Sequence, residues 1–277
     1  MIDNHLDLSI VVPAFGEAPF LEETLHSILS TQEKSIPIYV IDDASPTNSI
    51  RELCANRFPT VKYIRNSENL GISGNFNKSI SISQSKYVLV LGQDDILLTS
   101  LSIIFKPTQI GKNEIFAYMS KTQVYDSNSK SKFGIVDVAK KLVAPKTNRT
   151  YSGAQFRNRL LFGNWTYFPA IIWNKELLPE KPFREDLKYC MDFDLLLKMS
   201  FTPFKFYSSP FVAVGYRRHR QSTSMSAVPK ERLQEELMVM TKHSTGSVRE
   251  TIVCRLAIMQ RMNFVVSVLK NTTSRLR

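Results

Sequence analysis

The strongest constraint on the fold is a pattern repeated through about the first hundred residues. A short apolar run, a polar loop and a segment with apolar residues at helical spacing follow one another. The apolar runs lie at residues 6–12, 36–41, 61–64 and 87–91. Short runs rich in β-branched residues are typical of buried strands, and strands that alternate with helices favour right-handed βαβ crossovers. We therefore predict an α/β fold with a mostly parallel sheet flanked by helices.

Pairs of carboxylates lie at or just after the ends of two of these runs. Asp42 and Asp43 come after the second run, and Asp94 and Asp95 come after the fourth. In an open parallel sheet the carboxyl ends of the strands meet at the edge where ligands bind. The pair after the fourth run suits a hard divalent cation, which prefers oxygen ligands. The alternative is that this pair caps a helix that begins near Thr99.

Composition fits a packed globular protein. The chain has 277 residues, of which 43% are hydrophobic, enough for one large α/β domain or two small ones. We find no uninterrupted apolar stretch of the roughly 18 residues that a membrane span needs. Residues 1–7 have neither the basic nor the apolar region of an export signal. We therefore expect a cytoplasmic location.

Cysteine content and charge narrow the class of protein further. Cys54, Cys190 and Cys254 are far apart and lack metal-ligand spacing, so we interpret all three as small core residues. The formal net charge of +11 favours an acidic partner, which is a nucleic acid, an anionic membrane surface or a phosphorylated substrate. Charge alone does not choose among them.

The regular alternation stops after residue 98. We predict strands at residues 115–125, 165–173, 204–207 and 211–216, and helices at 151–162, 190–200, 230–240 and 248–269. Residues 126–150 are polar and rich in lysine. The expected organisation is one domain over residues 1–225, with halves 1–98 and 99–225, followed by a basic helical extension at 226–277.

Three motifs at successive strand ends carry a family resemblance: IVVPAF at residues 10–15, IDDAS at 41–45 and GQDD at 92–95. MDFDL at residues 191–195 and YRRH at 216–219, followed by Ser222, come later in the chain. In this order the motifs resemble those of GT-A glycosyltransferases of family 2. The resemblance implies a Rossmann-like GT-A domain that uses a nucleotide sugar and covers the chain to about residue 225.

The resemblance also implies where the nucleotide binds. Asp43 corresponds to the carboxylate that accepts a hydrogen bond from the uracil N–H, with Asp42 beside it. The alternatives are that Pro13 only ends a strand and that both carboxylates cap a helix before Ser49. The implied nucleotide-binding residues are Pro13, Ala14, Phe15, Glu17, Asp42, Asp43, Asn69, Gly71 and Asp94.

The metal-binding motif departs from the family's commonest form, because Gly92 stands where its first acidic residue would be. The resemblance implies that Asp94 and Asp95 bind Mn²⁺ or Mg²⁺ with one protein ligand fewer, for which His219 is the first candidate. It also implies that Arg217 and Arg218 contact the diphosphate.

For the catalytic base the resemblance points to Asp192, although Met191 replaces the usual Glu beside it. A carboxylate at this position takes the proton of the acceptor hydroxyl on the face opposite the leaving group. The alternative is that Asp192 caps the helix at residues 190–200. Asn164, Trp165 and Asp194 are the implied acceptor contacts, although an aromatic residue such as Trp165 also suits a core.

The expected activity is a metal-dependent inverting transfer of sugar. The donor is a nucleotide sugar, with UDP as the expected nucleotide, and the acceptor is a saccharide or polyprenyl-linked saccharide in cell-surface polysaccharide synthesis. The alternatives are a sugar-nucleotide nucleotidyltransferase, although no glycine-rich basic loop follows the first strand, and a basic nucleic-acid-binding protein. The basic C-terminal segment suits either contact with an anionic membrane at its inner face or packing on the domain.

Overall fold

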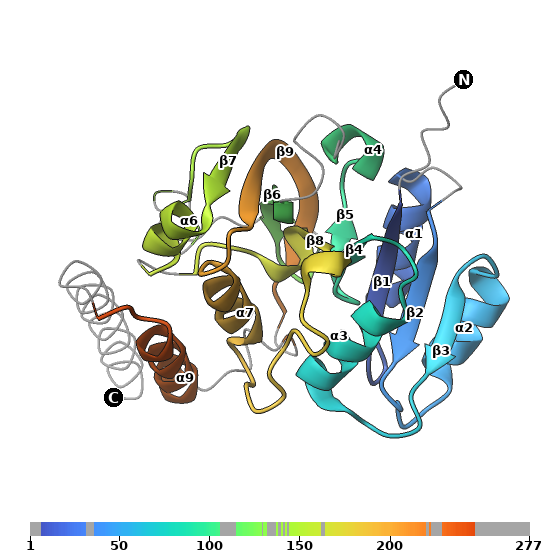
Figure 1. The fold of residues 1–277 in the computed structure, drawn as a ribbon. Coiled ribbons are helices and arrows are strands. Elements are labelled where there is room, and N and C mark those ends of the chain that lie inside the picture. Colours follow the sequence, from blue (N-terminus) through green and yellow to red (C-terminus); the bar gives the residue numbers. More distant parts are fainter. Residues whose placement is uncertain are drawn as a thin grey trace, which may run out of the picture.

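The first half of the chain forms four parallel strands joined by helices (Figure 1). The computed structural model describes residues 7–31, 36–105, 115–128, 130–131, 137, 140, 142, 144–161, 164–219, 222 and 229–246. Its first strands are β1 (Leu8–Ala14), β2 (Ile38–Asp42), β3 (Lys62–Arg65) and β4 (Tyr87–Val90). The helices between them are α1 (Leu21–Thr31), α2 (Ser49–Arg57) and α3 (Gly71–Ile82). The predicted βαβ pattern is confirmed.

The register of these strands brings their carboxyl ends together. β1 pairs in parallel with both β2 and β4, with Ala14 opposite Asp42 and Val11 opposite Val90. β2 also pairs in parallel with β3. The loops that follow β1, β2, β3 and β4 therefore lie at one edge of the sheet, as the sequence predicted.

The second half extends the sheet in mixed directions. Its elements are β5 (Ile96–Leu97), α4 (Leu101–Ile104), β6 (Ile115–Tyr125), β7 (Arg149–Ser152), α6 (Gly153–Leu160), a 3₁₀ helix at Phe168–Ala170, β8 (Ile171–Asn174), a second 3₁₀ helix at Lys175–Leu177, α7 (Met191–Met199), β9 (Lys205–Arg217) and α9 (Pro229–Lys242). The strand order is β3-β2-β1-β4-β8-β6-β9-β5, with β7 on β9. β8 runs antiparallel to both β4 and β6, so only the first half is wholly parallel.

Several predicted boundaries in this half were wrong. The two strands expected at residues 204–207 and 211–216 are one strand, β9, whose pairing with β6 is shifted around Pro210. A proline cannot donate a ladder hydrogen bond, which explains the interruption. The strand expected at residues 165–173 begins only at Ile171, because Pro169 lies in a 3₁₀ helix. β5 and β7 were not predicted.

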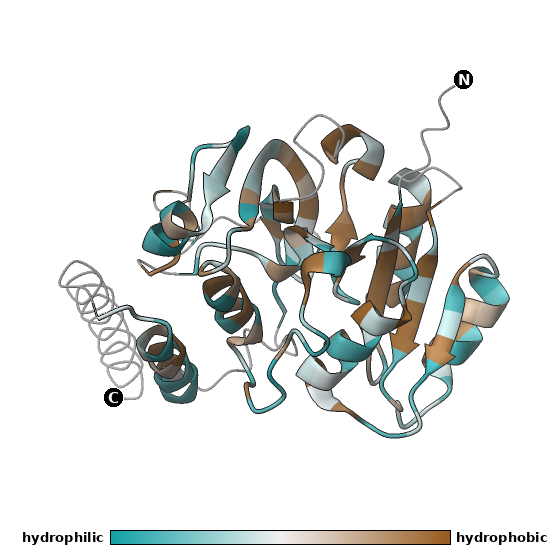
Figure 2. Cartoon of the chain, viewed as in Figure 1, coloured by the Kyte–Doolittle hydropathy of each residue, from teal (hydrophilic) through white to brown (hydrophobic). Residues whose placement is uncertain are grey.

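The core lies on both faces of the sheet. Ile10 and Val12 of β1 face a cluster with Leu25 of α1, whereas Val11 faces a second cluster with Trp173. This alternation is expected of a strand buried on both faces. Figure 2 shows apolar residues concentrated in the central strands, whereas α2 and α9 at the periphery carry many hydrophilic residues.

The predictions for the cysteines and the last two helices are confirmed only where the structure describes the residues. Cys54 and Cys190 are buried and free, as predicted, whereas Cys254 lies outside the described residues. α9 confirms the helix predicted at residues 230–240, and the helix predicted at 248–269 also lies outside the described residues. Within the described part of the chain, no helix is long and apolar enough to cross a membrane.

Candidate active site

The loops at the carboxyl edge line a cavity of about 590 Å³. The loop after β1, the start of α3 and the loop after β4 form its walls. Of the predicted nucleotide-binding residues, the following line it: Pro13, Ala14, Phe15, Glu17, Asp43, Asn69, Gly71 and Asp94. The fold therefore brings together side chains that lie up to about eighty residues apart in the sequence.

Hydrogen bonds between loops hold this cavity open. The backbone N–H of Phe15 donates to Gln93 Oε1 at 2.8 Å, and Gln93 Nε2 donates to the Phe15 carbonyl at 3.2 Å. Next to them, the N–H of Gly16 donates to Ser45 Oγ at 3.0 Å. Gly16 has a φ of +78°, a conformation that glycine adopts without strain. The loops after β1, β2 and β4 thus form one connected rim.

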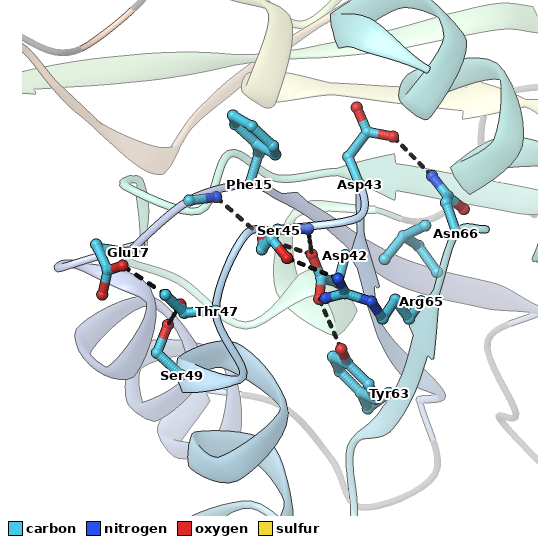
Figure 3. A network of polar contacts seen from close by, with 12 residues as sticks. Phe15, Glu17, Asp42, Asp43, Ser45, Thr47, Ser49, Tyr63, Arg65 and Asn66 are labelled. Carbon is cyan, nitrogen blue, oxygen red and sulfur yellow. Dashed lines mark hydrogen bonds and ion pairs between the residues drawn. The ribbon is translucent and has the colours of Figure 1, made fainter. Parts of the chain in front are cut away.

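Asp43 is the buried carboxylate of the cavity. Its Oδ1 accepts from Asn66 Nδ2 at 2.8 Å and from the N–H of Leu70 at 2.9 Å. Its second oxygen points away from Asn66 (Figure 3). This carboxylate is therefore held in one orientation by its partners, with an oxygen that can accept a further hydrogen bond.

Asp42, by contrast, lies outside the cavity lining and is fully buried. Its Oδ1 accepts from the N–H and the hydroxyl of Ser45, and its Oδ2 from Tyr63 and Arg65, all within 2.9 Å (Figure 3). Burial raises the pKa of Asp42, but these hydrogen bonds outweigh burial and lower it overall. We therefore interpret Asp42 as a residue that stabilises the loop after β2, and not as the nucleotide contact that was predicted.

Replacing Asp42 with Ala should lower the free energy of unfolding by about 1–3 kcal/mol, because three polar partners lose their acceptor. Urea unfolding measures this change. Glu68→Ala, at an exposed position of the next loop, is the control and should stay within about 0.5 kcal/mol of the wild type. An Asp42→Ala protein as stable as this control would contradict the structural role.

Asp94 and Asp95 fold back over Gly92. A Cβ atom added at Gly92 would lie 2.6 Å from Asp95 Oδ2 and 2.8 Å from Asp94 Oδ1. The two carboxylate oxygens therefore converge on one point, and the same crowding explains why glycine replaces the first acidic residue of the motif. His219 Nε2 lies 2.7 Å from Asp94 Oδ2, so the predicted third member of the group is adjacent.

The electrostatics of this pair favour a cation. Asp95 is buried, and burial together with the negative charge of Asp94 raises its pKa well above the usual value, despite the backbone N–H and the positive charge of Arg217. A divalent cation would relieve both effects. Among the described residues, no group of three or more His, Cys, Asp and Glu side chains is arranged to hold a metal ion. The residues present therefore fit a divalent cation that two carboxylates would hold, with its remaining ligands supplied by substrate and water.

The two predicted diphosphate ligands each pair with a carboxylate. The Arg217 guanidinium is buried, donates to Glu23 Oε2 at 2.6 Å and lies 4.5 Å from the centre of the Phe20 ring. Arg218 forms a bidentate pair with Asp137, at 2.6 and 3.0 Å. Neither arginine lines this first cavity, but Arg218 lines the adjoining one together with Asp94.

A second cavity, of about 400 Å³, adjoins the first. Phe76 and Asp94 line both cavities, and Asp192 lines the second. Asn164 lies next to Asp192, with its Nδ2 at 3.4 Å from Asp192 Oδ2. Thr166 fixes this amide, since its N–H and its hydroxyl both donate to Asn164 Oδ1. The two cavities therefore form a path from Asp43 past Asp94 to Asp192.

Asp192 is not the cap of α7. The N-cap residue is Cys190, and Asp192 lies in the first turn, where its Oδ1 accepts from the N–H of Phe193 at 2.8 Å. Burial raises the pKa of Asp192 above its usual value, although Phe193, Asn164 and the charge of Lys140 oppose the shift. A carboxylate with a raised pKa is a stronger base, which suits it to take a proton.

Sequence reasoning missed Lys140. Its Nζ donates to the Thr166 carbonyl at 3.0 Å and lies 3.9 Å from the centre of the Tyr167 ring. Burial lowers the pKa of Lys140 to about 8, although Asp192 attracts the proton. Lys140 lies in the lysine-rich segment at residues 126–150, which carries no motif that could have distinguished it. Arg232 of α9 also lines this cavity and was missed for the same reason.

Two predicted acceptor contacts lie away from Asp192's cavity. Trp165 is buried against Phe156 and lines a separate cavity of about 370 Å³. Asp194 is buried between elements, where its Oδ1 accepts from Arg184 at 3.3 Å and contacts His243 at 2.9 Å. Because aromatic packing and ion pairs hold these side chains, only Asn164 remains a candidate acceptor contact among the three predicted.

Known proteins resemble this chain in sequence. Residues 9–117 match the family model described as Glycosyl transferase family 2. The cholesterol galactosyltransferase of Borreliella burgdorferi is 26% identical over 257 residues, which cover 86% of this chain and 68% of that protein.

Solved structures share the fold. Residues 1–349 of S. aureus TarS, in complex with UDP-GlcNAc, superpose with a TM-score of 0.61 and 16% identity, covering 92% of this chain and 71% of that one. A mannosyltransferase from Pyrobaculum calidifontis, in complex with GDP-Man and Mn²⁺, gives a TM-score of 0.59 and 13% identity, covering 99% of this chain and 81% of that one.

Proposed function

Since the chain is a glycosyltransferase of family 2 with a GT-A fold, we propose that it transfers a sugar, with inversion, from a UDP-sugar to a hydroxyl of a saccharide or lipid-linked saccharide. One observation carries the proposal. The cavity that contains Asp43 and the cavity that contains Asp192 meet at Asp94. A nucleotide at one end and an acceptor at the other would place the bond to be broken between them.

Each end of this path has a distinct role. Asp43 accepts a hydrogen bond from the nucleobase, while the backbone of Pro13, Ala14 and Phe15 lies along its edge. Asp192 takes the proton of the acceptor hydroxyl as the oxygen attacks the anomeric carbon. Because attack and departure occur on opposite faces of the sugar, a single displacement inverts the configuration.

Asp94 and Asp95 are the residues that would hold Mn²⁺ or Mg²⁺. The convergence of Asp95 Oδ2 and Asp94 Oδ1 over Gly92 supports this assignment, as does the raised pKa of Asp95. A bound divalent cation supplies positive charge that stabilises the leaving diphosphate. His219 holds Asp94 in place through its contact with Oδ2.

The acceptor side is proposed in less detail. A relative is described as acting on cholesterol, which supports a lipid acceptor, and a net charge of +11 would attract anionic lipid head groups. We therefore propose a cytoplasmic reaction at the inner face of the membrane, in the synthesis of a cell-surface polysaccharide.

Binding experiments test the nucleotide specificity directly. Thermal-shift screening of UDP- and GDP-sugars with Mn²⁺ should select a UDP-sugar, and titration should show that UDP binds more tightly with Mn²⁺ than without it. A duplex oligonucleotide is the comparison. Binding of the duplex without metal, combined with no binding of UDP, would overturn the proposal.

The pH dependence of transfer should report the electrostatic interaction between Lys140 and Asp192. Because Asp192 has a raised pKa, the rate should rise with pH through a value above the usual Asp range, about 3.9. Lys140→Gln removes a positive charge that favours the ionised carboxylate, so this rise should move to higher pH. Lys140 is protonated below about pH 8, so the shift is observable there.

Lys198→Gln is the matched control for this shift. Lys198 is exposed on α7, the same helix as Asp192, and does not line the second cavity. Its variant should reproduce the wild-type profile. A Lys140→Gln profile that stays in place or moves to lower pH would show that Lys140 does not act on the base.

A further inference from the structure

Helix α9 packs directly against α7, the helix that carries Asp192. Val239 and Met240 of α9 are fully buried in the same core cluster as Leu195 and Leu196 of α7. Figure 1 shows the two helices side by side. α9 is therefore part of the wall around the second cavity, to which it contributes Arg232.

A single carboxylate of α9 binds the backbone that leads into α7. Glu235 Oε1 accepts from the N–H groups of Tyr189 and Cys190, at 2.7 and 2.6 Å, and Oε2 accepts from the N–H of Lys188 at 3.0 Å. Three consecutive amides thus converge on one side chain. Charge-assisted bonds of this kind are among the strongest in proteins.

The start of α7 lacks a capping side chain of its own, which explains the role of a carboxylate from another helix. Its N-cap residue is Cys190, whose side chain makes no capping hydrogen bond. The first N–H groups of a helix lack partners within the helix, and its N-terminus attracts negative charge. Glu235 accepts from the N–H of the N-cap residue, Cys190, and places a negative charge next to this N-terminus, although it lies 45 positions away from Cys190.

We propose that Glu235 is a positioning residue that sets the place of the Asp192 carboxylate, an inference that rests on the proposed role of Asp192 as the base. Asp192 lies two residues after Cys190, and its Oδ1 bonds to the N–H of Phe193. Its position therefore follows the backbone that Glu235 holds. Tyr189 and Met191, on either side of Cys190, line the cavity as well.

Separate contacts keep α9 in place without Glu235. Besides Val239 and Met240, His243 contacts Asp194 Oδ1 at 2.9 Å. A change confined to Glu235 should therefore leave the helix docked while it frees residues 188–190. This separates a loss of positioning from a loss of folding.

Glu235→Gln tests the proposal, with Glu231→Gln as the matched control on the same helix. Within the described part of the chain, Glu231 accepts from the phenol of Tyr189 at 3.2 Å and from none of the three amides. For Glu235→Gln we expect faster hydrogen exchange at the amides of residues 188–190. We also expect a kcat about ten-fold lower, measured as release of nucleoside diphosphate from the donor selected above, with the donor KM within two-fold of the wild type. Glu231→Gln should match the wild type in all three.

The outcomes distinguish this inference from the proposed function. Wild-type kcat in Glu235→Gln, or unchanged protection of the three amides, overturns the positioning role while an inactive Asp192→Asn leaves the proposed function standing. Near-wild-type transfer by Asp192→Asn overturns the base assignment and this inference with it. Faster exchange spread over the whole chain, with a lowered Tm, would show that Glu235 acts on folding and would also overturn the inference.

Discussion

Asp192→Asn should bind UDP and Mn²⁺ as the wild type does, yet transfer sugar about 10²–10⁴-fold more slowly, the range that a general base contributes. Asparagine has the shape of aspartate, and its oxygen can still accept the bond from the N–H of Phe193. What it loses is the capacity to take a proton. The loss should therefore fall on kcat and leave nucleotide affinity unchanged.

Titration with UDP and measurement of nucleoside diphosphate release separate these two effects. Asp186→Asn is the control: Asp186 is an exposed carboxylate shortly before α7, paired with Arg184, and does not line the second cavity. The Asp186→Asn variant loses the same single negative charge as Asp192→Asn, and it should transfer sugar at the wild-type rate. Near-wild-type transfer by Asp192→Asn would place the base elsewhere.

The ends of the strands were predictable because strand and loop signals are local. The apolar runs and the loops after them depend on residues a few positions apart, so the order of β1 to β4 and their shared edge follow from the pattern. The second half was harder. β5 has only two residues, and β9 continues through Pro210, so neither has a clear local signal.

The roles of Asp42 and Asp43 show a limit of motif reasoning. Both belong to one motif, but neighbouring residues of an extended chain point to opposite sides. Val40 faces the core on the α1 and α2 side and Ile41 the other core cluster, so Asp42 turns toward Tyr63 and Asp43 toward Asn66. Extending the alternation of side chains in the apolar run at residues 36–41 to residues 42 and 43 would have placed the two carboxylates on opposite faces of the sheet.

Contacts between distant segments could not be predicted from one sequence. Arg217 pairs with Glu23, 194 residues away, and Arg218 with Asp137, 81 residues away. Each arginine matched the position of a diphosphate ligand, but the partner that engages it is specified only by the folded chain. The same holds for Glu235, whose contact with the start of α7 depends on the packing of α9.

Asp95→Asn should abolish the part of UDP binding that depends on Mn²⁺ without destabilising the metal-free protein. The variant replaces one of the two carboxylates whose oxygens converge over Gly92, and so removes one negative charge from the site. Its side-chain oxygen can still accept the bond that the N–H of Arg217 now donates to Asp95 Oδ1 at 3.0 Å. UDP affinity should therefore equal the metal-free value of the wild type at every Mn²⁺ concentration.

The stability of the variant follows from the sign of the pKa shift. The pKa of Asp95 is higher in the folded than in the unfolded state, so its ionised form opposes folding once the pH exceeds the unfolded value, about 3.9. Asparagine cannot ionise and avoids this penalty. The metal-free Tm at pH 7 should thus equal or exceed that of the wild type.

Asp43→Asn provides the matched control for the metal role. Asp43 lines the nucleotide cavity, but its bonded oxygen contacts Asn66 and Leu70 and takes no part in the convergence over Gly92. Its variant should weaken UDP binding by a similar factor with and without Mn²⁺, because a lost nucleobase contact does not depend on the ion. Metal-dependent UDP binding that survives in Asp95→Asn would exclude Asp95 as a metal ligand, whatever the behaviour of Asp43→Asn.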